Sequence, residues 1–157
     1  MITATEFAVE REALQVVMSR VFDAPRELVF KTYADPELKP RWWGPATLTT
    51  TVEQADNFPG GRWRIVQVDP EGNQHAFRGE VREFVPPERV VSTFEYEPMA
   101  GHVSIETAIF EDLDGRTRLT VTSQFASLED LEGMVQSGME SGARESWERL
   151  ADLLAGL

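Results

Sequence analysis

The sequence predicts an α+β domain in which an antiparallel sheet packs against a long C-terminal helix. Apolar, often β-branched or aromatic, residues alternate with polar ones over much of residues 14–125, whereas residues 127–157 repeat apolar residues at helical spacing. Turn signals such as Asp114-Gly115, Pro86-Pro87 and Asp69-Pro70-Glu71-Gly72-Asn73 separate adjacent strand-like runs. Because consecutive strands joined by short turns pair with their neighbours, these runs predict an antiparallel meander.

The N-terminal half begins with a strand and continues with two short helices. The first strand is predicted over residues 14–22, where apolar and polar residues alternate. Pro25 suits the first turn of a helix, and this helix is expected to end at Asp35-Pro36. A second short helix is predicted from Pro36 to about Trp42, because Gly44-Pro45 then stops it.

The meander follows the two short helices. Its six strands are predicted over residues 48–55, 62–68, 75–85, 89–97, 102–113 and 116–125. The first strand is available to join them, so we expect a sheet of about six to seven strands.

The C-terminal segment is predicted to be helical and to cover the sheet. Ser127 is a suitable N-cap, with Asp130 three residues further on. Gly133 and Gly138 each cost about 1 kcal/mol relative to Ala within a helix, so we expect a break near them and a continuous helix from about Ser137. Its apolar face comprises Leu128, Leu131, Val135, Met139, Ala143, Leu150, Leu153 and Leu157.

Composition limits the classes of function. A chain of 157 residues is expected to form one domain, with residues 1–12 as a flexible or loosely attached segment. The net charge of -12 argues against nucleic acid and anionic membranes as partners. Cysteine is absent, which excludes disulfides, thiolate metal sites and a cysteine nucleophile. No apolar run of about 18 residues and no export signal occur, so we expect no membrane span and a cytoplasmic location.

Four motifs carry a resemblance to a known family. They are Val21-Phe22-Asp23-Ala24-Pro25, Trp42-Trp43-Gly44-Pro45, Pro59-Gly60-Gly61-Arg62-Trp63 and Gly142-Ala143-Arg144-Glu145-Ser146-Trp147-Glu148-Arg149-Leu150. In this order the chain resembles the Hsp90 ATPase activator homologue family of the START-like superfamily, also called SRPBCC or Bet v 1-like. The resemblance implies a helix-grip fold, a curved antiparallel sheet wrapped around the C-terminal helix with a cavity between them. In this superfamily the cavity often holds a hydrophobic small molecule, and a minority of members are enzymes.

Small residues at the centre of the C-terminal helix suggest where such a cavity lies. Gly142, Ala143 and Ser146 stand where Leu or Phe would normally fill space. Either a bulky strand residue fills this notch, or the notch is the floor of a ligand pocket, and the resemblance favours the pocket. The predicted cavity-lining residues are Trp43, Trp63, Phe77, Phe94, Ile105, Val135, Met139, Gly142, Ala143 and Ser146.

The tryptophans on the two glycine-rich bends have two interpretations. Trp42 and Trp43 either anchor the helical elbow to the sheet or gate the mouth of the cavity. Trp63 follows Gly60-Gly61 and is expected to face inward where the sheet bends.

The polar residues give little sign of catalysis. His75 and His102 have no further ligands at metal-binding spacing, so neither a metal nor another cofactor is expected. His102 and Glu106 share a strand face, but a surface pair is the simpler interpretation than a general base. No catalytic residue is therefore assigned. Arg78, Glu80 and Arg82 are expected on the solvated convex face of the sheet.

The leading hypothesis is a domain that binds a hydrophobic or lipid-like small molecule between sheet and helix. Enzymatic activity is not expected. The alternatives are a protein-interaction module related to the chaperone activators and an enzyme of the cyclase or hydrolase type. The enzyme needs a titratable group that points into the cavity. Whether the protein is a monomer or a homodimer is left open by the sequence.

Overall fold

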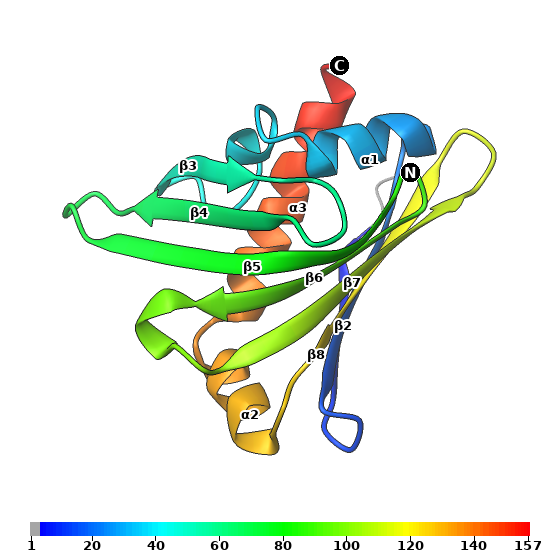
Figure 1. Ribbon diagram of the computed structural model, residues 1–157. Helices are drawn as coiled ribbons and strands as arrows, with labels where there is room; N and C mark the ends of the chain where they lie inside the picture. The colour runs from blue at the N-terminus through cyan, green and yellow to red at the C-terminus, as the bar shows by residue number, and fades with distance from the viewer. Residues whose placement is uncertain (1–3) are drawn as a thin grey trace.

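Eight strands form a single antiparallel sheet in the computed structural model, which describes residues 4–157. The order across the sheet is β1-β2-β8-β7-β6-β5-β4-β3 (Figure 1). The strands are β1 (Glu6–Glu10), β2 (Gln15–Phe22), β3 (Thr49–Ala55), β4 (Arg62–Val68), β5 (Gln74–Val85), β6 (Arg89–Tyr96), β7 (Val103–Asp112) and β8 (Thr117–Gln124). Strands β3 to β8 are the predicted meander, and β2 joins it beside β8.

The helices are α1 (Arg26–Ala34), α2 (Leu128–Gln136) and α3 (Met139–Ala155), with two short 3₁₀ turns, η1 (Lys39–Arg41) and η2 (Glu97–Met99). The predicted break in the C-terminal segment is confirmed, since Gly138 adopts a φ of 87° between α2 and α3. The second predicted short helix is reduced to η1, because Pro36 and Pro40 supply no backbone N–H for a regular helix.

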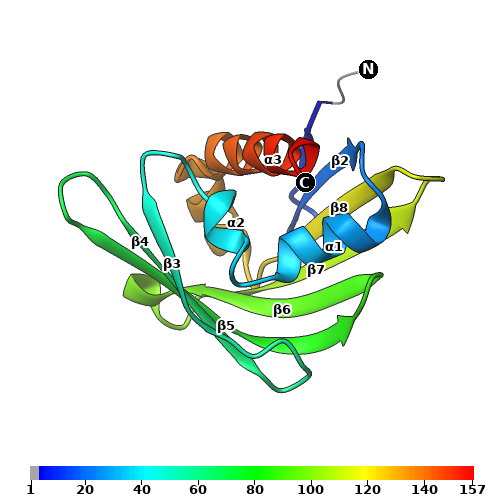
Figure 2. The ribbon, with the colours of Figure 1, turned by 90° about the horizontal axis from the view of Figure 1, so that it is seen from above.

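The sheet curves strongly, and α3 runs along its concave side (Figure 2). Helix α1 lies at one end of the resulting cup, between α3 and the sheet (Figure 2). The main core fills this end, and its largest fully buried side chains include Phe22, Trp42, Phe110, Leu119 and Leu150. The architecture is therefore the predicted α+β helix-grip fold. Within residues 4–157, no helix is both long and apolar enough to cross a bilayer.

Strand β1 is the main departure from the expected fold. It lies within the segment expected to be loosely attached, yet it pairs with β2 from Glu6 opposite Ser19 to Glu10 opposite Gln15. Ahead of it, the buried Thr5 accepts hydrogen bonds from two arginines that are distant in the sequence. Arg20 Nη1 lies 3.4 Å from Thr5 Oγ1, and Arg144 Nη1 donates to the Thr5 carbonyl. These contacts explain the eighth strand.

Candidate ligand-binding site

The elbow between η1 and β3 is held by polar side chains of α3. Ser146 Oγ accepts a hydrogen bond from the Gly44 amide at 2.8 Å, and Arg149 Nη1 donates to the Gly44 carbonyl at 2.6 Å. Glu145 Oε2 accepts from the Ala46 amide at 2.7 Å. Ser146 also donates to the Gly142 carbonyl at 3.0 Å. The small residue at position 146 therefore fixes the elbow as well as leaving space beside it.

Gly44 itself is required by the geometry of the elbow. Its φ is 83°, a region that favours glycine, and a Cβ there would lie 1.9 Å from Gln67 Nε2. Glycine at this position therefore allows the bend that follows the two tryptophans, and Trp43 contacts Phe77 of the sheet.

The two adjacent tryptophans have different roles. Trp42 is only 2% exposed, stacks on Tyr33 at 5.2 Å between ring centroids, and donates from Nε1 to the Thr32 carbonyl at 3.0 Å. It anchors the elbow. Trp43 is half-buried and meets Phe77 edge-on at 5.3 Å. Because one side of its ring faces open space, Trp43 forms a cavity wall.

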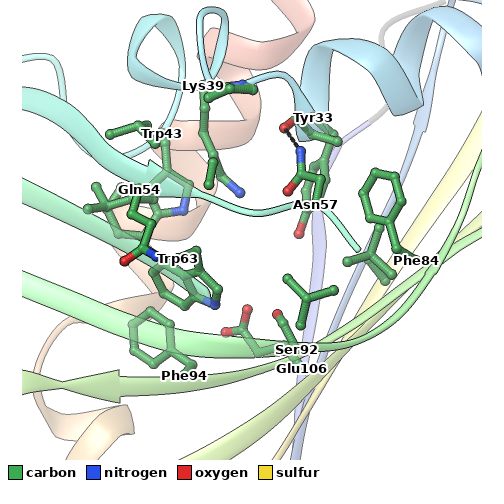
Figure 3. A pocket seen from close by; sticks show the side chains of 18 residues that line it. Tyr33, Lys39, Trp43, Gln54, Asn57, Trp63, Phe84, Ser92, Phe94 and Glu106 are labelled. Carbon is green, nitrogen blue, oxygen red and sulfur yellow. Dashed lines mark hydrogen bonds between the residues drawn. The ribbon is translucent and has the colours of Figure 1, made fainter. Parts of the chain in front are cut away.

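Two cavities lie between the sheet and the helices. The first, of about 80 Å³, lies under the segment from α1 to β3 (Figure 3). Its apolar lining includes Trp43, Trp63, Ile65, Val81, Phe84 and Phe94, and its polar lining includes Tyr33, Lys39, Gln54, Asn57, Ser92 and Glu106. The second, of about 130 Å³, extends toward α3 and is lined by Phe7, Met18, Met139, Ala143, Ser146 and Trp147 among others. Tyr33, Trp43 and Glu106 line both cavities, so these three side chains separate them.

Lys39 and Glu106 face each other across the first cavity (Figure 3). Lys39 extends from η1 so that its Nζ lies 5.1 Å from the centroid of the Tyr33 ring and 6.0 Å from that of the Trp42 ring. Glu106 projects from β7. In the part of the chain that the structure describes, no ion pair within 4.0 Å joins Lys39 to a carboxylate.

Burial shifts the protonation of both groups toward their neutral forms. It lowers the pKa of Lys39 to about 8, although the charge of Glu106 acts in the opposite direction. Burial likewise raises the pKa of Glu106, while Lys39 and a hydrogen bond with Ser123 oppose this shift. The pKa of Tyr33 is raised by burial and, to a lesser extent, by Glu106. The cavity therefore holds titratable groups and is not lined by carbon alone.

The predicted lining residues divide into two groups. Trp43, Trp63, Phe94, Met139, Ala143 and Ser146 line at least one of the two cavities. Four others are not among the lining residues of either cavity. Phe77 packs behind Trp43 and Phe94, and Val135 belongs to a separate cluster around Val16, Phe125 and Leu131. Within the described residues 4–157, no atom of another segment lies within 4 Å of where a Cβ on Gly142 would stand, so this glycine adjoins open space.

Ile105 lies on the opposite face of the sheet from the cavities. The register pairs it with Thr93 and Gln124, whereas Glu106 pairs with Ser92 and Ser123. The buried Ser104, Ala108 and Phe110 fix this phase, so alternation turns Glu106 inward and Ile105 outward. Sequence reasoning chose the more apolar residue and thereby assigned the wrong face to this strand.

The two histidines lie away from the cavities. His102 Nδ1 is 2.6 Å from Asp130 Oδ1, and His75 Nδ1 is 3.0 Å from the Tyr96 hydroxyl. His102 therefore pairs with a carboxylate of α2 and not with Glu106. Among residues 4–157, no cluster of three or more His, Cys, Asp or Glu side chains has the geometry to hold a metal ion.

Sequence reasoning missed Tyr33, Lys39 and Glu106 as cavity residues. One signal for Lys39 is present in the composition, since only Lys31 and Lys39 of the fifteen Lys and Arg residues are lysines. A signal for Glu106 is its spacing of two and four residues from Ala108 and Phe110, which share its face.

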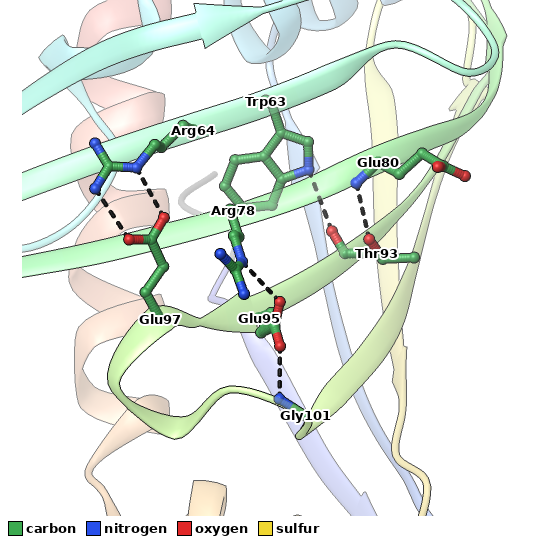
Figure 4. Close-up of polar contacts among 8 residues, drawn as sticks. All are labelled: Trp63, Arg64, Arg78, Glu80, Thr93, Glu95, Glu97 and Gly101. Carbon is green, nitrogen blue, oxygen red and sulfur yellow. Dashed lines mark hydrogen bonds and ion pairs between the residues drawn. The ribbon is translucent and has the colours of Figure 1, made fainter.

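The convex face of the sheet is charged, as predicted. Arg78, Glu80 and Arg82 are exposed there. Arg64 makes a bidentate contact with Glu97 at 2.7 and 2.9 Å, and Arg78 Nε lies 2.8 Å from Glu95 Oε1 (Figure 4). Because these charges are paired with one another and solvated, we assign no binding role to this face.

The geometry defines a class of protein, namely a helix-grip domain with a largely apolar cavity between its sheet and its helices, into which a few polar side chains point. The family model described as activator of Hsp90 ATPase homolog 1-like protein matches residues 23–155, and the chain belongs to this family. A search of the curated proteins finds no match.

Solved structures share the fold over nearly the whole chain. A protein from Arthrobacter aurescens, solved by NMR, is 28% identical with a TM-score of 0.89, and the match covers 97% of this chain and 92% of that one. A protein from Mycobacterium smegmatis, solved as a crystal structure, is 26% identical with a TM-score of 0.87, and the match covers 98% of this chain and 97% of that one. The AHSA1 protein from Silicibacter pomeroyi is 26% identical with a TM-score of 0.74, covering 90% and 97%.

Proposed function

We propose that this protein binds a small, mainly apolar molecule that carries one polar group, in the two cavities between the sheet and the helices. The observation that carries the proposal is the shared boundary of these cavities, which the ring of Trp43 and the titratable Glu106 both line. Cavities of this kind, apolar with a few convergent polar groups, are typical of small-molecule sites.

The size of the cavities limits the ligand. Volumes of about 80 and 130 Å³ are well below the roughly 300–1,000 Å³ of sites for drug-sized molecules. An apolar cavity of about 150 Å³ holds benzene. Neither cavity alone reaches that volume, so a short chain fits without rearrangement, whereas a single ring requires Trp43 to move, because Trp43 lines both cavities.

The lining defines how such a molecule is oriented. Aromatic rings of Trp43, Trp63 and Phe94 favour a planar or aliphatic body. Lys39 and Glu106 offer a hydrogen-bond donor and acceptor on opposite sides of the first cavity. The polar group of the ligand is expected between them, where it can bond to Lys39 and Glu106, while its apolar body contacts the rings.

The four tryptophans provide a direct test. Trp42, Trp43, Trp63 and Trp147 all line one or the other cavity, so their indole N–H signals report on occupancy. We expect toluene, added to ¹⁵N-labelled protein, to shift the Trp43 and Trp63 indole signals in a saturable way. Native mass spectrometry of freshly purified protein provides a second measurement, in which a retained small molecule adds its mass to that of the protein.

A matched pair of variants separates binding from folding. Ala143→Leu fills part of the second cavity, whereas Gly142→Ala adds a methyl group where no other segment is within 4 Å. We expect Ala143→Leu to remain folded and to lose ligand signal from the second cavity, and Gly142→Ala to keep the wild-type ligand signal. Unshifted indole signals at saturating toluene in the wild type would refute the proposal.

The family description favours one alternative, a module that contacts an Hsp90-type chaperone. Its test is a pull-down at low salt with the purified chaperone, where screening of charges is weakest.

Cytoplasmic location and the choice between monomer and homodimer stay predictions. The enzymatic alternative requires a reactive group in the cavity, and Lys39 is the residue to consider for it.

A further inference from the structure

We propose that the side-chain amine of Lys39 forms an imine with a small aldehyde bound in the first cavity. The inference rests on the proposed function, because the aldehyde must enter the cavity before it reacts. It adds a chemical class of ligand, a single-ring or short-chain aldehyde, and a covalent step at a defined atom.

The choice of residue at position 39 is the first observation. Thirteen of the fifteen Lys and Arg residues are arginines, since only positions 31 and 39 hold lysine. Lys39 is nevertheless the basic residue that lines the first cavity, whereas Lys31 is exposed on α1. A guanidinium stays protonated and is a poor nucleophile, while a buried amine loses its proton readily. The lysine therefore occurs where a nucleophilic nitrogen can be used.

The position of the amine is the second observation. The Lys39 side chain runs along the faces of Tyr33 and Trp42 and points into the cavity (Figure 3). Glu106 lies on the far side, and no ion pair within 4.0 Å closes the gap between them. In the proposed adduct geometry, a carbonyl group bound in this cavity turns its carbon toward Lys39 and its oxygen toward Glu106.

The protonation of the pair is the third observation. A neutral amine with a neutral carboxylic acid has the same net charge as an ammonium with a carboxylate. Burial shifts both groups toward this neutral pair, because it lowers the pKa of Lys39 to about 8 and raises the pKa of Glu106. At pH 7 a minority of Lys39 side chains is therefore neutral, a larger fraction than for an exposed lysine. The neutral amine is the nucleophile, and the neutral acid is a proton donor.

The step balances with these two groups. The Lys39 nitrogen attacks the carbonyl carbon, the C=O electron pair moves to oxygen, and a proton passes from nitrogen to oxygen to give a carbinolamine. Glu106 then protonates the hydroxyl group, which leaves as water while a C=N bond forms. The products are a protonated imine on Lys39, a carboxylate on Glu106 and one water. The carboxylate faces the cation that it has helped to form, which stabilises the adduct.

Reductive trapping tests the inference. Wild-type protein is incubated at pH 7 with benzaldehyde and sodium cyanoborohydride, which delivers hydride to the imine carbon and makes the bond permanent. Peptide mapping by mass spectrometry then gives the rate at each amine. We expect Lys39 to be modified at least tenfold faster than Lys31, the matched internal control on α1. Equal rates at the two lysines would overturn the inference.

Toluene as a competitor separates this inference from the proposed function. Fast labelling of Lys39 that toluene slows supports both. If toluene shifts the indole signals of Trp43 and Trp63 but Lys39 reacts no faster than Lys31, the binding proposal stands and the imine inference fails. Fast labelling that toluene does not slow would place the reaction outside the cavity and also overturn the inference. If toluene does not bind, both fail.

One variant checks the assignment of the site. Lys39→Arg keeps the positive charge and removes the primary amine. We expect it to lose modification at position 39 and to retain the modification rate at Lys31. A lower unfolding midpoint of the variant would indicate a folding defect, and the wild-type ratio of Lys39 to Lys31 then decides.

Discussion

The indole ring of Trp63 occupies the space that a side chain at Gly79 would need. The two residues are paired across β4 and β5, and a Cβ on Gly79 would lie 2.4 Å from Trp63 Nε1 and 2.0 Å from the Thr93 carbonyl oxygen. The same Nε1 donates to that carbonyl at 3.2 Å. The glycine therefore lets the ring lie flat on the sheet, where it forms a wall of the first cavity.

Gly79→Ala is expected to displace this ring. The added methyl group has no room against the indole and the backbone, so we expect a loss of about 1–3 kcal/mol in the free energy of unfolding. The Trp63 indole N–H should also shift as its bond to Thr93 is lost. Urea unfolding followed by circular dichroism measures the first effect, and ¹⁵N–¹H NMR the second.

Gly142→Ala is the matched control for Gly79→Ala. It lies within α3, where a Cβ meets no other segment. Alanine is the better helix former and restricts the unfolded chain, so we expect a gain of about 0.5–1 kcal/mol in the free energy of unfolding. A loss of stability at position 142 would show that the helix packs more tightly there than the structure indicates.

Lys39→Met is expected to stabilise the protein in a pH-dependent way. Between pH 8 and 10.5 the unfolded chain keeps a proton on Lys39 that the folded protein has released, so the stability of the wild type rises with pH across this range. Below pH 8 the folded protein bears the full cost of the buried ammonium. The advantage of Lys39→Met should therefore be constant below pH 8 and diminish toward pH 10.5.

Urea unfolding of the wild type and Lys39→Met from pH 6 to 10.5 measures this difference. Lys31→Met is the control, since Lys31 is exposed and should show no comparable trend. A difference between Lys39→Met and the wild type that does not change with pH would contradict the lowered pKa of Lys39.

Ser146→Ala is expected to loosen the elbow. The substitution removes the acceptor for the Gly44 amide and costs about 1 kcal/mol in the free energy of unfolding. The Gly44 amide should exchange with solvent faster, which hydrogen-exchange NMR detects. Ser141→Ala, at an exposed position of the same helix, should change neither quantity. If the Gly44 amide exchanges at the same rate in Ser146→Ala and Ser141→Ala, Arg149 and Glu145 hold the elbow without the serine.

Glu148→Gln tests the attachment of the N-terminal strand. Arg20 has a side chain only 6% exposed and contacts Glu148 at 2.7 Å, and among residues 4–157 no partner bonds to its Nε. Loss of the carboxylate should therefore cost about 1.5 kcal/mol in the free energy of unfolding and increase proteolysis before β2. Glu140→Gln, which breaks the exposed pair with Arg144, should cost only about 0.3–0.5 kcal/mol. Equal costs would show that burial of Arg20 is unimportant.

Most of the fold follows from local patterns in the sequence. Alternation and turn residues predict β2 to β8, and Gly138 predicts the break before α3, because these signals act within a few residues. Strand β1 escapes such reasoning. It has five residues with a glutamate at each end, and its anchors Arg20 and Arg144 lie far along the chain.

The candidate site is less predictable, because it depends on the phase of strands and on contacts between distant segments. Large rings such as Trp43 and Trp63 are recognisable as inward-facing, since their burial is favourable anywhere in the core. Glu106 is not recognisable as inward-facing in this way, because local hydrophobicity favours Ile105 for the inner face. The pairing of β7 with β6 and β8 instead places Glu106 on the inner face and Ile105 on the outer face. Lys39 lines the cavity only because η1 lies above the sheet, and no local sequence pattern specifies the position of η1.

The open sheet leaves β1 and β3 as its two outermost strands. Exposed strand edges can pair with those of another molecule and so seed aggregation. Glu6 and Glu10 on β1 are exposed, Glu53 on β3 forms an ion pair with Arg64, and the whole chain carries a net charge of -12. Two copies that approach edge to edge therefore bring like charges together, a repulsion that salt weakens. The acidity of this chain protects the edges that a curved, unclosed sheet must leave free.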